Sequence, residues 1–237
     1  MLDYLRNSAF ISVRDVGLFL ASARSDARLE SLRRDGPAAA AFDRLYADAA
    51  HNDPWASGRP QYQYQRRKYD ALARLLPKRR YRRALDLGCG LGLFSERLSC
   101  CADQVLGIDI SEVAIGRAAE RTRRAGNVEL RQGDILDLGP ELDGSFDLVV
   151  VADTIYYLPQ PIQDTTLKAL AARISELLAP DGILLVANHY FPMPNAETRL
   201  TRRIHQSFQW SPRLTLFSEH KGAFFLASLL GPVAAPA

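Results

Sequence analysis

Short apolar runs alternate with amphipathic segments through the middle of the chain. The runs typical of buried strands cover residues 84–88, 105–109, 128–134, 146–153 and 182–188. Between them, apolar residues at helical spacing predict helices over 91–99, 111–126 and 162–179. Strands that alternate with helices in this way predict an α/β fold, a doubly wound Rossmann-like sheet that is mostly parallel.

The two ends of the chain follow different patterns. Residues 1–50 have helical spacing in Phe10–Leu20 and Ala38–Leu45, a polar loop covers 51–63, and a further helix is expected over Tyr62–Leu76. We therefore predict an N-terminal helical cap over 1–60 and a main domain over 61–237. Near the C-terminus, residues 214–220 and 223–230 flank Lys221-Gly222 and predict an antiparallel hairpin.

Composition is that of an ordinary globular protein and points to a cytoplasmic location. The 237 residues are 47% hydrophobic and 24% charged, and no apolar run approaches the roughly 20 residues of a membrane helix. Charged residues interrupt the N-terminal apolar stretches, so we expect no signal peptide. Cys89, Cys100 and Cys101 lack the spacing of metal ligands, and no metal site is predicted.

Basic residues cluster at 66–68 and 78–83, although the net charge is only +3. Such clusters can bind nucleic acid, but a solvated helix face and a loop before a buried strand are the favoured explanation. No aromatic and basic platform accompanies them, so a nucleic-acid partner is not predicted.

Three glycines, Gly88, Gly90 and Gly92, follow the first predicted strand of the sheet. Ligands of doubly wound folds bind there, where glycines admit a ligand to the backbone and a helix N-terminus follows. Asp109 ends the next strand, about 20 residues on, where an acid typically binds ribose hydroxyls. This pattern predicts an adenosine ligand without a 2′-phosphate.

Two residues argue against a dinucleotide and hence against an NAD-dependent oxidoreductase. A dinucleotide fingerprint requires a third glycine at position 93, which is Leu93. Asp86, two residues before the first glycine, disfavours a pyrophosphate and suits an amino group and a sulfonium cation.

Four motifs occur in the order found in class I S-adenosylmethionine-dependent methyltransferases. They are DLGCGLG at 86–92, the acid that ends the second strand, RQGD at 131–134 and FDLVV at 146–150. The resemblance covers about Asp53–Asn188. The DPW at 53–55, the stretch over 65–90 and the IYYL at 155–158 resemble NodS-like methyltransferases, which include nodulation N-methyltransferases acting on an amino-sugar. A longer N-terminal segment and a different C-terminal third prevent us from carrying the acceptor over.

The resemblance implies S-adenosylmethionine as the cofactor and a set of residues that bind it: Trp55, Arg67, Tyr69, Asp86, Gly88, Gly90, Gly92, Asp109, Ile110, Asp134, Ile135 and Asp153. Asp86 and Gly88 would lie near the methionine moiety, and Gly90 and Gly92 would admit close backbone approach. Asp109 would bind the ribose, with Ile110, Asp134 and Ile135 around the adenine. A turn residue that ends a strand is the alternative for Asp134, and the order of the motifs favours the adenine contact.

Trp55, Arg67 and Tyr69 precede the first strand, in the region that covers the cofactor in NodS-like enzymes. An arginine there could hold the methionine carboxylate, and helical spacing does not choose between Arg66 and Arg67. Trp55 and Tyr69 could instead be core residues that anchor a helix.

Asp153, Tyr156 and His189 are the candidate catalytic residues, because they follow strands whose ends face the transferred methyl in this fold. Asp153 could orient or deprotonate an acceptor, and His189 is the best-placed histidine for a general base, although a hydrogen-bonded structural histidine fits as well. Tyr156 could wall the pocket.

The expected reaction is methyl transfer to a nitrogen or oxygen of a small-molecule acceptor, such as an amino-sugar or natural-product intermediate. An RNA or protein methyltransferase is disfavoured, because Ala152-Asp153-Thr154-Ile155 replaces an NPPY-type motif. A non-catalytic binding subunit is a third alternative. Phe208–Trp210 and Phe224–Leu230 could form a homodimer contact, or belong to the core or the pocket wall.

Overall fold

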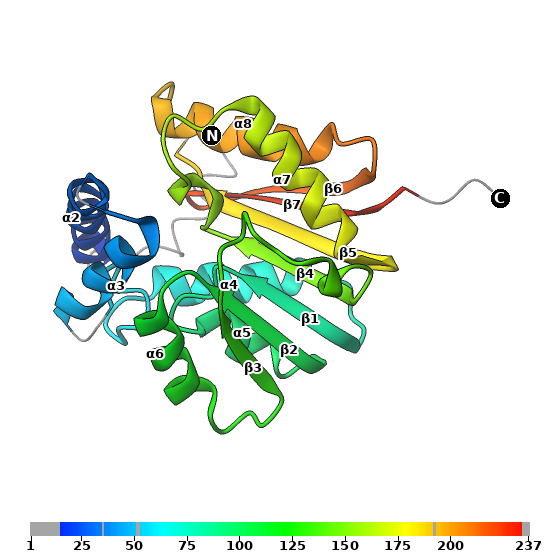
Figure 1. The fold of residues 1–237 in the computed structure, drawn as a ribbon, viewed down its shortest axis with the longest axis horizontal. Helices are drawn as coiled ribbons and strands as arrows, with labels where there is room; N and C mark the ends of the chain where they lie inside the picture. The colour runs from blue at the N-terminus through cyan, green and yellow to red at the C-terminus, as the bar shows by residue number, and fades with distance from the viewer. Residues whose placement is uncertain (1–14, 35, 51–52, 192, 234–237) are drawn as a thin grey trace.

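A computed structural model describes residues 15–34, 36–50, 53–191 and 193–233 (Figure 1). Its seven-stranded sheet has the order β3-β2-β1-β4-β5-β7-β6. The strands are β1 Tyr81–Leu87, β2 Ala102–Asp109, β3 Val128–Gln132, β4 Phe146–Ala152, β5 Leu178–His189, β6 Leu214–Gly222 and β7 Phe225–Pro232. β1 to β5 pair in parallel and β7 runs antiparallel to both β5 and β6, which confirms the predicted sheet and hairpin.

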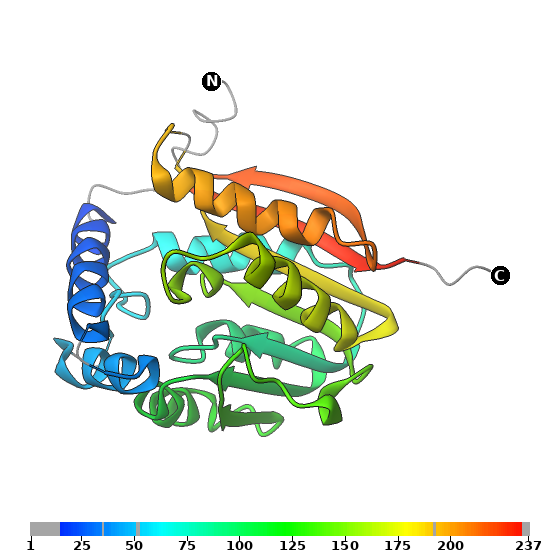
Figure 2. The ribbon, with the colours of Figure 1, turned by 45° about the horizontal axis from the view of Figure 1, so that its top comes forward.

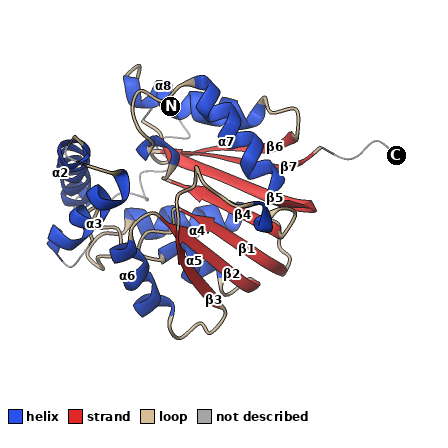
Figure 3. Cartoon of the chain, viewed as in Figure 1, coloured by secondary structure: helices blue, strands red, loops and turns tan. Residues whose placement is uncertain are grey.

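Helices cover both faces of the sheet (Figure 3). The described α-helices are α2 Val16–Arg33, α3 Ala38–Asp48, α4 Tyr64–Leu75, α5 Leu93–Leu98, α6 Glu112–Thr122, α7 Asp164–Glu176 and α8 Ala196–Gln209; two 3₁₀ turns, η4 Pro140–Leu142 and η5 Ile155–Tyr157, complete them. α7 and α8 share a core cluster with one face, and α4 and α5 share a cluster with the other. Central strands buried on both faces explain the continuous apolar runs of the sequence.

Helix α8 was not expected from the sequence, and the boundary after α7 also differs. α7 ends at Glu176 and β5 begins at Leu178, whereas the pattern predicted a helix to residue 179 and a strand from Gly182. The buried side of α8 includes Thr198, Thr201 and His205, so polar residues interrupt its apolar spacing.

The C-terminal apolar segments that could have formed a dimer contact are mostly core. Phe208 and Phe225 are fully buried and β7 is buried almost throughout, whereas Trp210 is 75% exposed. The homodimer remains a prediction. Because these segments are mostly buried, they do not offer a surface for it.

Helices α2 and α3 lie beyond the carboxyl ends of the central strands (Figure 2). Leu45 and Tyr46 of α3 join a small core cluster with Leu91 and Ala114. The expected helix from Phe10 lies partly outside the described residues, and the division into a cap over 1–60 and a domain over 61–237 remains a prediction.

Gly92 shows how tightly the glycine loop packs on α6. It has a φ of +71°, and a Cβ there would lie 3.0 Å from the Ala118 Cβ. We expect Gly92→Ala to destabilise the fold by about 1–3 kcal/mol, because a non-glycine residue is strained in this conformation.

Gly116→Ala is the matched control in the exposed middle of α6. A Cβ at Gly116 meets nothing within 4 Å, so alanine should stabilise the helix by about 0.5–1 kcal/mol. Urea unfolding of both variants checks the pair, and a Gly92→Ala protein as stable as the wild type would contradict the packing.

Candidate active site

A deep cavity opens at the carboxyl ends of β1, β2 and β4, between the sheet and the segments that precede it. Most of the predicted site residues line it: Trp55, Tyr69, Gly88, Gly90, Asp109, Ile110, Asp134, Ile135, Asp153, Tyr156 and His189. Three predicted residues, Arg67, Asp86 and Gly92, do not. Counting the part open to solvent, the cavity holds about 1290 Å³ of space.

The glycine loop brings backbone to the floor of the cavity. Gly88 and Gly90 have φ values of +73° and +51°. The Gly90 N–H donates to Asp109 Oδ2 at 2.8 Å, and the Ser111 N–H donates to Oδ1 at 3.0 Å. Asp109 is therefore held at the end of β2, and burial raises its pKa.

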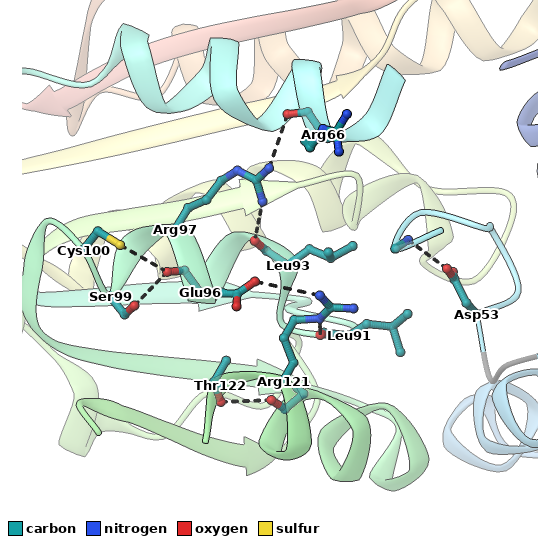
Figure 4. Close-up of polar contacts among 12 residues, drawn as sticks. Asp53, Arg66, Leu91, Leu93, Glu96, Arg97, Ser99, Cys100, Arg121 and Thr122 are labelled. Carbon is teal, nitrogen blue, oxygen red and sulfur yellow. Dashed lines mark hydrogen bonds and ion pairs between the residues drawn. The ribbon is translucent and has the colours of Figure 1, made fainter. Parts of the chain in front are cut away.

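Arginine side chains fasten the loop from outside the cavity (Figure 4). Arg121 on α6 donates to the Leu91 carbonyl at 2.9 Å. Arg97 donates to the carbonyls of Leu93, at 2.9 Å, and Arg66, at 3.4 Å. The Arg121 bond ties the loop to α6, and the bond from Arg97 to Arg66 ties α5, which follows the loop, to α4.

Asp86 lies behind the loop rather than at the cavity surface. Its side chain is almost fully buried, and the Ser95 hydroxyl donates to its Oδ2 at 2.6 Å. Burial raises the pKa of Asp86 to about 6, while the bond from Ser95 opposes the rise. The carboxyl thus joins the end of β1 to α5.

A buried charge cluster occupies the other side of the cavity, where β4 and β5 end. Asp153 has a φ of +56°. Its Oδ2 forms an ion pair with Lys68 of α4 and accepts from Gln65 Nε2 at 3.4 Å. His189 Nε2 lies 3.9 Å from Asp153 Oδ1, beyond hydrogen-bond range.

Each charge in this cluster alters the pKa of its neighbours. Burial alone would raise the pKa of Asp153, but Lys68 and His189 outweigh it and the net pKa is lowered. Burial lowers the pKa of Lys68, and Asp153 opposes that change. Burial and then the Lys68 charge lower the pKa of His189 to about 4, so the imidazole is neutral at pH 7.

Lys68 is the residue that sequence reasoning missed. The candidates in the same basic run were Arg66, which is exposed, and Arg67, which is half-buried and does not line the cavity. Lys68 is fully buried, with its ammonium 5.8 Å and 5.7 Å from the ring centroids of Tyr64 and Tyr69.

Helix α2 runs along the cavity and covers it. With 18 residues, it spans about 27 Å. Leu18, Phe19 and Ser22 line the cavity from its first half, and Arg33 lines it from the last turn. Asp26, between these ends, accepts hydrogen bonds from Trp55 Nε1 at 2.9 Å and from the Tyr157 hydroxyl at 3.0 Å.

Comparison with known proteins relates this geometry to one family. The methyltransferase domain family matches residues 84–182. Nodulation protein S of Sinorhizobium fredii is 27% identical over 142 residues, which cover 60% of this chain and 62% of that protein. Trans-aconitate 2-methyltransferase of Deinococcus radiodurans is 37% identical over 123 residues, which cover 50% and 43%.

A solved structure matches most of the length of this chain. The N-methyltransferase NodS of Bradyrhizobium japonicum WM9, in complex with S-adenosyl-L-homocysteine, aligns with a TM-score of 0.66 and 25% identity. The alignment covers 81% of this chain and 98% of that one. In sequence and fold, the chain is similar to class I, NodS-like methyltransferases. The match to the two curated relatives spans only 43% and 62% of their length.

This methyltransferase family implies S-adenosylmethionine as the cofactor. The cradle of Gly88 and Gly90 and the acid at the end of β2 fit a nucleoside. Among the residues described, no group of three or more His, Cys, Asp or Glu side chains could hold a metal ion. Within the same residues, no helix has the length and apolarity needed to cross a membrane.

The Lys68–Asp153 ion pair should be essential for stability. Lys68→Met leaves a buried carboxylate uncompensated, which we expect to destabilise the fold by about 3–5 kcal/mol. Adding Asp153→Asn should recover part of this loss. Because the pKa of Asp153 is lowered, the carboxylate's contribution should also disappear as pH falls below the ordinary carboxyl range.

Urea unfolding of the single and double variants measures this coupling. Lys78→Met, which removes an exposed lysine before β1, is the control and should change stability by less than about 0.5 kcal/mol. A Lys68→Met protein as stable as this control would show that the ion pair does not contribute to stability.

Proposed function

We propose that the protein transfers a methyl group from S-adenosylmethionine to a nitrogen or oxygen of a small-molecule acceptor. The observation that carries this proposal is the cavity in which the Gly88–Gly90 backbone and Asp109 converge at the end of β2. The structural likeness to NodS in complex with S-adenosyl-L-homocysteine supports the same ligand class.

The cofactor would lie across the strand ends. Asp109 would accept hydrogen bonds from the ribose hydroxyls, and Ile110, Asp134 and Ile135 would surround the adenine. The methionine part would then extend over Gly88 toward Asp153 and Tyr156. Asp86 and Gly92 do not line the cavity and would act indirectly, by shaping the glycine loop. Arg67 does not line the cavity either, so a contact between Arg67 and the cofactor is not part of this proposal.

The methyl transfer mainly requires that the acceptor atom is aligned with the methyl carbon of the cofactor. The acceptor lone pair attacks the methyl carbon opposite sulfur, the carbon–sulfur bond breaks and its electron pair stays on sulfur. Holding the two reactants in line can supply most of the rate enhancement. Helix α2 and α3, as part of the predicted cap over 1–60, would exclude water from the closed complex.

Nitrogen is the favoured acceptor atom. The groups near the transfer point are poor bases: His189 has a pKa of about 4, Asp153 is paired with Lys68, and burial raises the pKa of Tyr156. A hydroxyl would have to lose its proton to such a group, whereas a neutral amine attacks with its own lone pair.

The cavity also favours a small acceptor over RNA or protein. Helix α2 lines the cavity from Leu18 to Arg33 and is held to Trp55 and Tyr157 through Asp26, which places the helix over part of the opening. A macromolecular acceptor would require this roof to move away.

Calorimetric titration with S-adenosyl-L-homocysteine tests the proposed function. We expect micromolar binding by the wild type. Asp109→Asn should weaken it by about 1.5–3 kcal/mol, the value of a hydrogen bond to a charged group.

Asp103→Asn, at the exposed start of the same strand, is the matched control and should bind like the wild type. An Asp109→Asn protein with unchanged affinity would disprove the ribose placement. Absence of binding in folded wild-type protein would disprove the proposed function.

A further inference from the structure

The proposed function does not define the acceptor molecule. The cavity wall around Asp153 restricts the chemical class to which the acceptor can belong. We propose that the acceptor is an amine on an apolar body, with its nitrogen against Asp153 Oδ1 and its apolar part against Leu18, Phe19 and Tyr156. This inference rests on the proposed function and adds the class of molecule that the site accepts.

Asp153 offers one oxygen to a ligand. Oδ2 is engaged by Lys68 and Gln65, whereas Oδ1 is buried and has no hydrogen-bond partner in the described structure. A buried carboxylate oxygen without a partner is costly, and a bound N–H group would satisfy it. Because Asp153 lines the cavity, that group can come from a ligand.

Aromatic rings lie beside the charge cluster that contains this oxygen. The Tyr64 ring stacks on His189 with centroids 6.1 Å apart, and the Phe19 ring lies 5.3 Å from that of Tyr64. This chain of rings places Phe19 at the same end of the cavity as His189. The ring centroid of Phe224 lies 5.9 Å from that of Phe19, so a second apolar ring packs against this part of the wall.

Few polar groups at this end could serve a sugar. Several of the polar groups near Asp153 already have partners. The Gln65 amide donates to Asp153, the Thr154 hydroxyl to the Leu87 carbonyl and the Tyr157 hydroxyl to Asp26. The other polar side chains that line this part are Ser22, Tyr69, Tyr156 and His189. A sugar would bring several hydroxyls, and buried hydroxyls without partners strongly disfavour binding. An apolar molecule with a single polar nitrogen matches both the unpartnered oxygen of Asp153 and the aromatic wall.

The charges of the whole cavity favour the same class. Four carboxylates line it, from Asp53, Asp109, Asp134 and Asp153, against the one guanidinium of Arg33. Lys68 offsets one of these charges from behind the wall. The remaining negative potential attracts a protonated amine into the cavity as well as the sulfonium of the cofactor.

The reaction balances without a strong base. The ammonium form of the acceptor loses one proton to water on entering, and the neutral nitrogen keeps an N–H bonded to Asp153. Its lone pair forms the new carbon–nitrogen bond while the carbon–sulfur bond breaks, which leaves S-adenosyl-L-homocysteine and a methylated ammonium. The methylated ammonium forms with its positive charge next to Asp153. It then leaves the cavity and exchanges its proton with water.

Ligand-observed NMR titrations on protein saturated with S-adenosyl-L-homocysteine test this inference. The probes are 3-phenylpropylamine, 3-phenylpropan-1-ol and glucosamine. We expect the amine to bind about tenfold more tightly than the alcohol, because it gains a charge-assisted hydrogen bond, and glucosamine to bind weakest.

Two variants assign the preference to its residues. Asp153→Asn should remove the difference between amine and alcohol, whereas Phe19→Ala should weaken both by a similar factor. Phe217→Ala, which truncates a ring that is 55% exposed on β6, is the control and should change neither. Circular dichroism confirms that each variant is folded.

Several outcomes would overturn the inference. They are glucosamine binding as tightly as the phenyl amine, an amine preference that survives Asp153→Asn, and no binding of the phenyl amine to the saturated protein. If calorimetry shows that S-adenosyl-L-homocysteine itself does not bind, the proposed function fails and this inference fails with it. The two failures are therefore distinguishable.

Discussion

The reversal of strand order at β1 determines where this molecule can hold a ligand. β1 pairs with β2 on one side and β4 on the other, so the connections that follow β1 and β4 leave toward opposite faces of the sheet. The gap between them is the floor of the cavity. Gly88 and Thr154 meet in this gap so closely that a Cβ on Gly88 would lie 2.2 Å from the threonine hydroxyl. Substitution there would displace one of the two loops.

Two further elements build on this gap. Lys68, from the helix that precedes the sheet, supplies a buried charge that fixes Asp153 at the end of β4. Helix α2 then covers the opening, and Asp26 ties it to Trp55 and Tyr157. The same helix contributes Phe19 to the cavity lining near Tyr64 and His189, so the segment over the cavity also forms part of its wall.

Sequence patterns predicted the features that depend on local spacing, and missed those that depend on tertiary contact. The strands, the glycine loop and Asp109 could be located because a period of two, a period of 3.6 and glycine itself have direct structural causes. Lys68 could not, because a lysine beside two arginines looks like a solvated face until the position of Asp153 is known. Helix α8 was missed because Thr198, Thr201 and His205 occupy its buried side.

A crystal structure of the protein with S-adenosyl-L-homocysteine tests the central claim most directly, because the orientation of the nucleoside assigns every residue of the cavity. The account predicts ribose hydroxyls on Asp109, adenine against Ile110 and Ile135, and the sulfur directed toward Asp153 and Tyr156. Adenine bound at the His189 end, or a ligand outside the cavity, would contradict it.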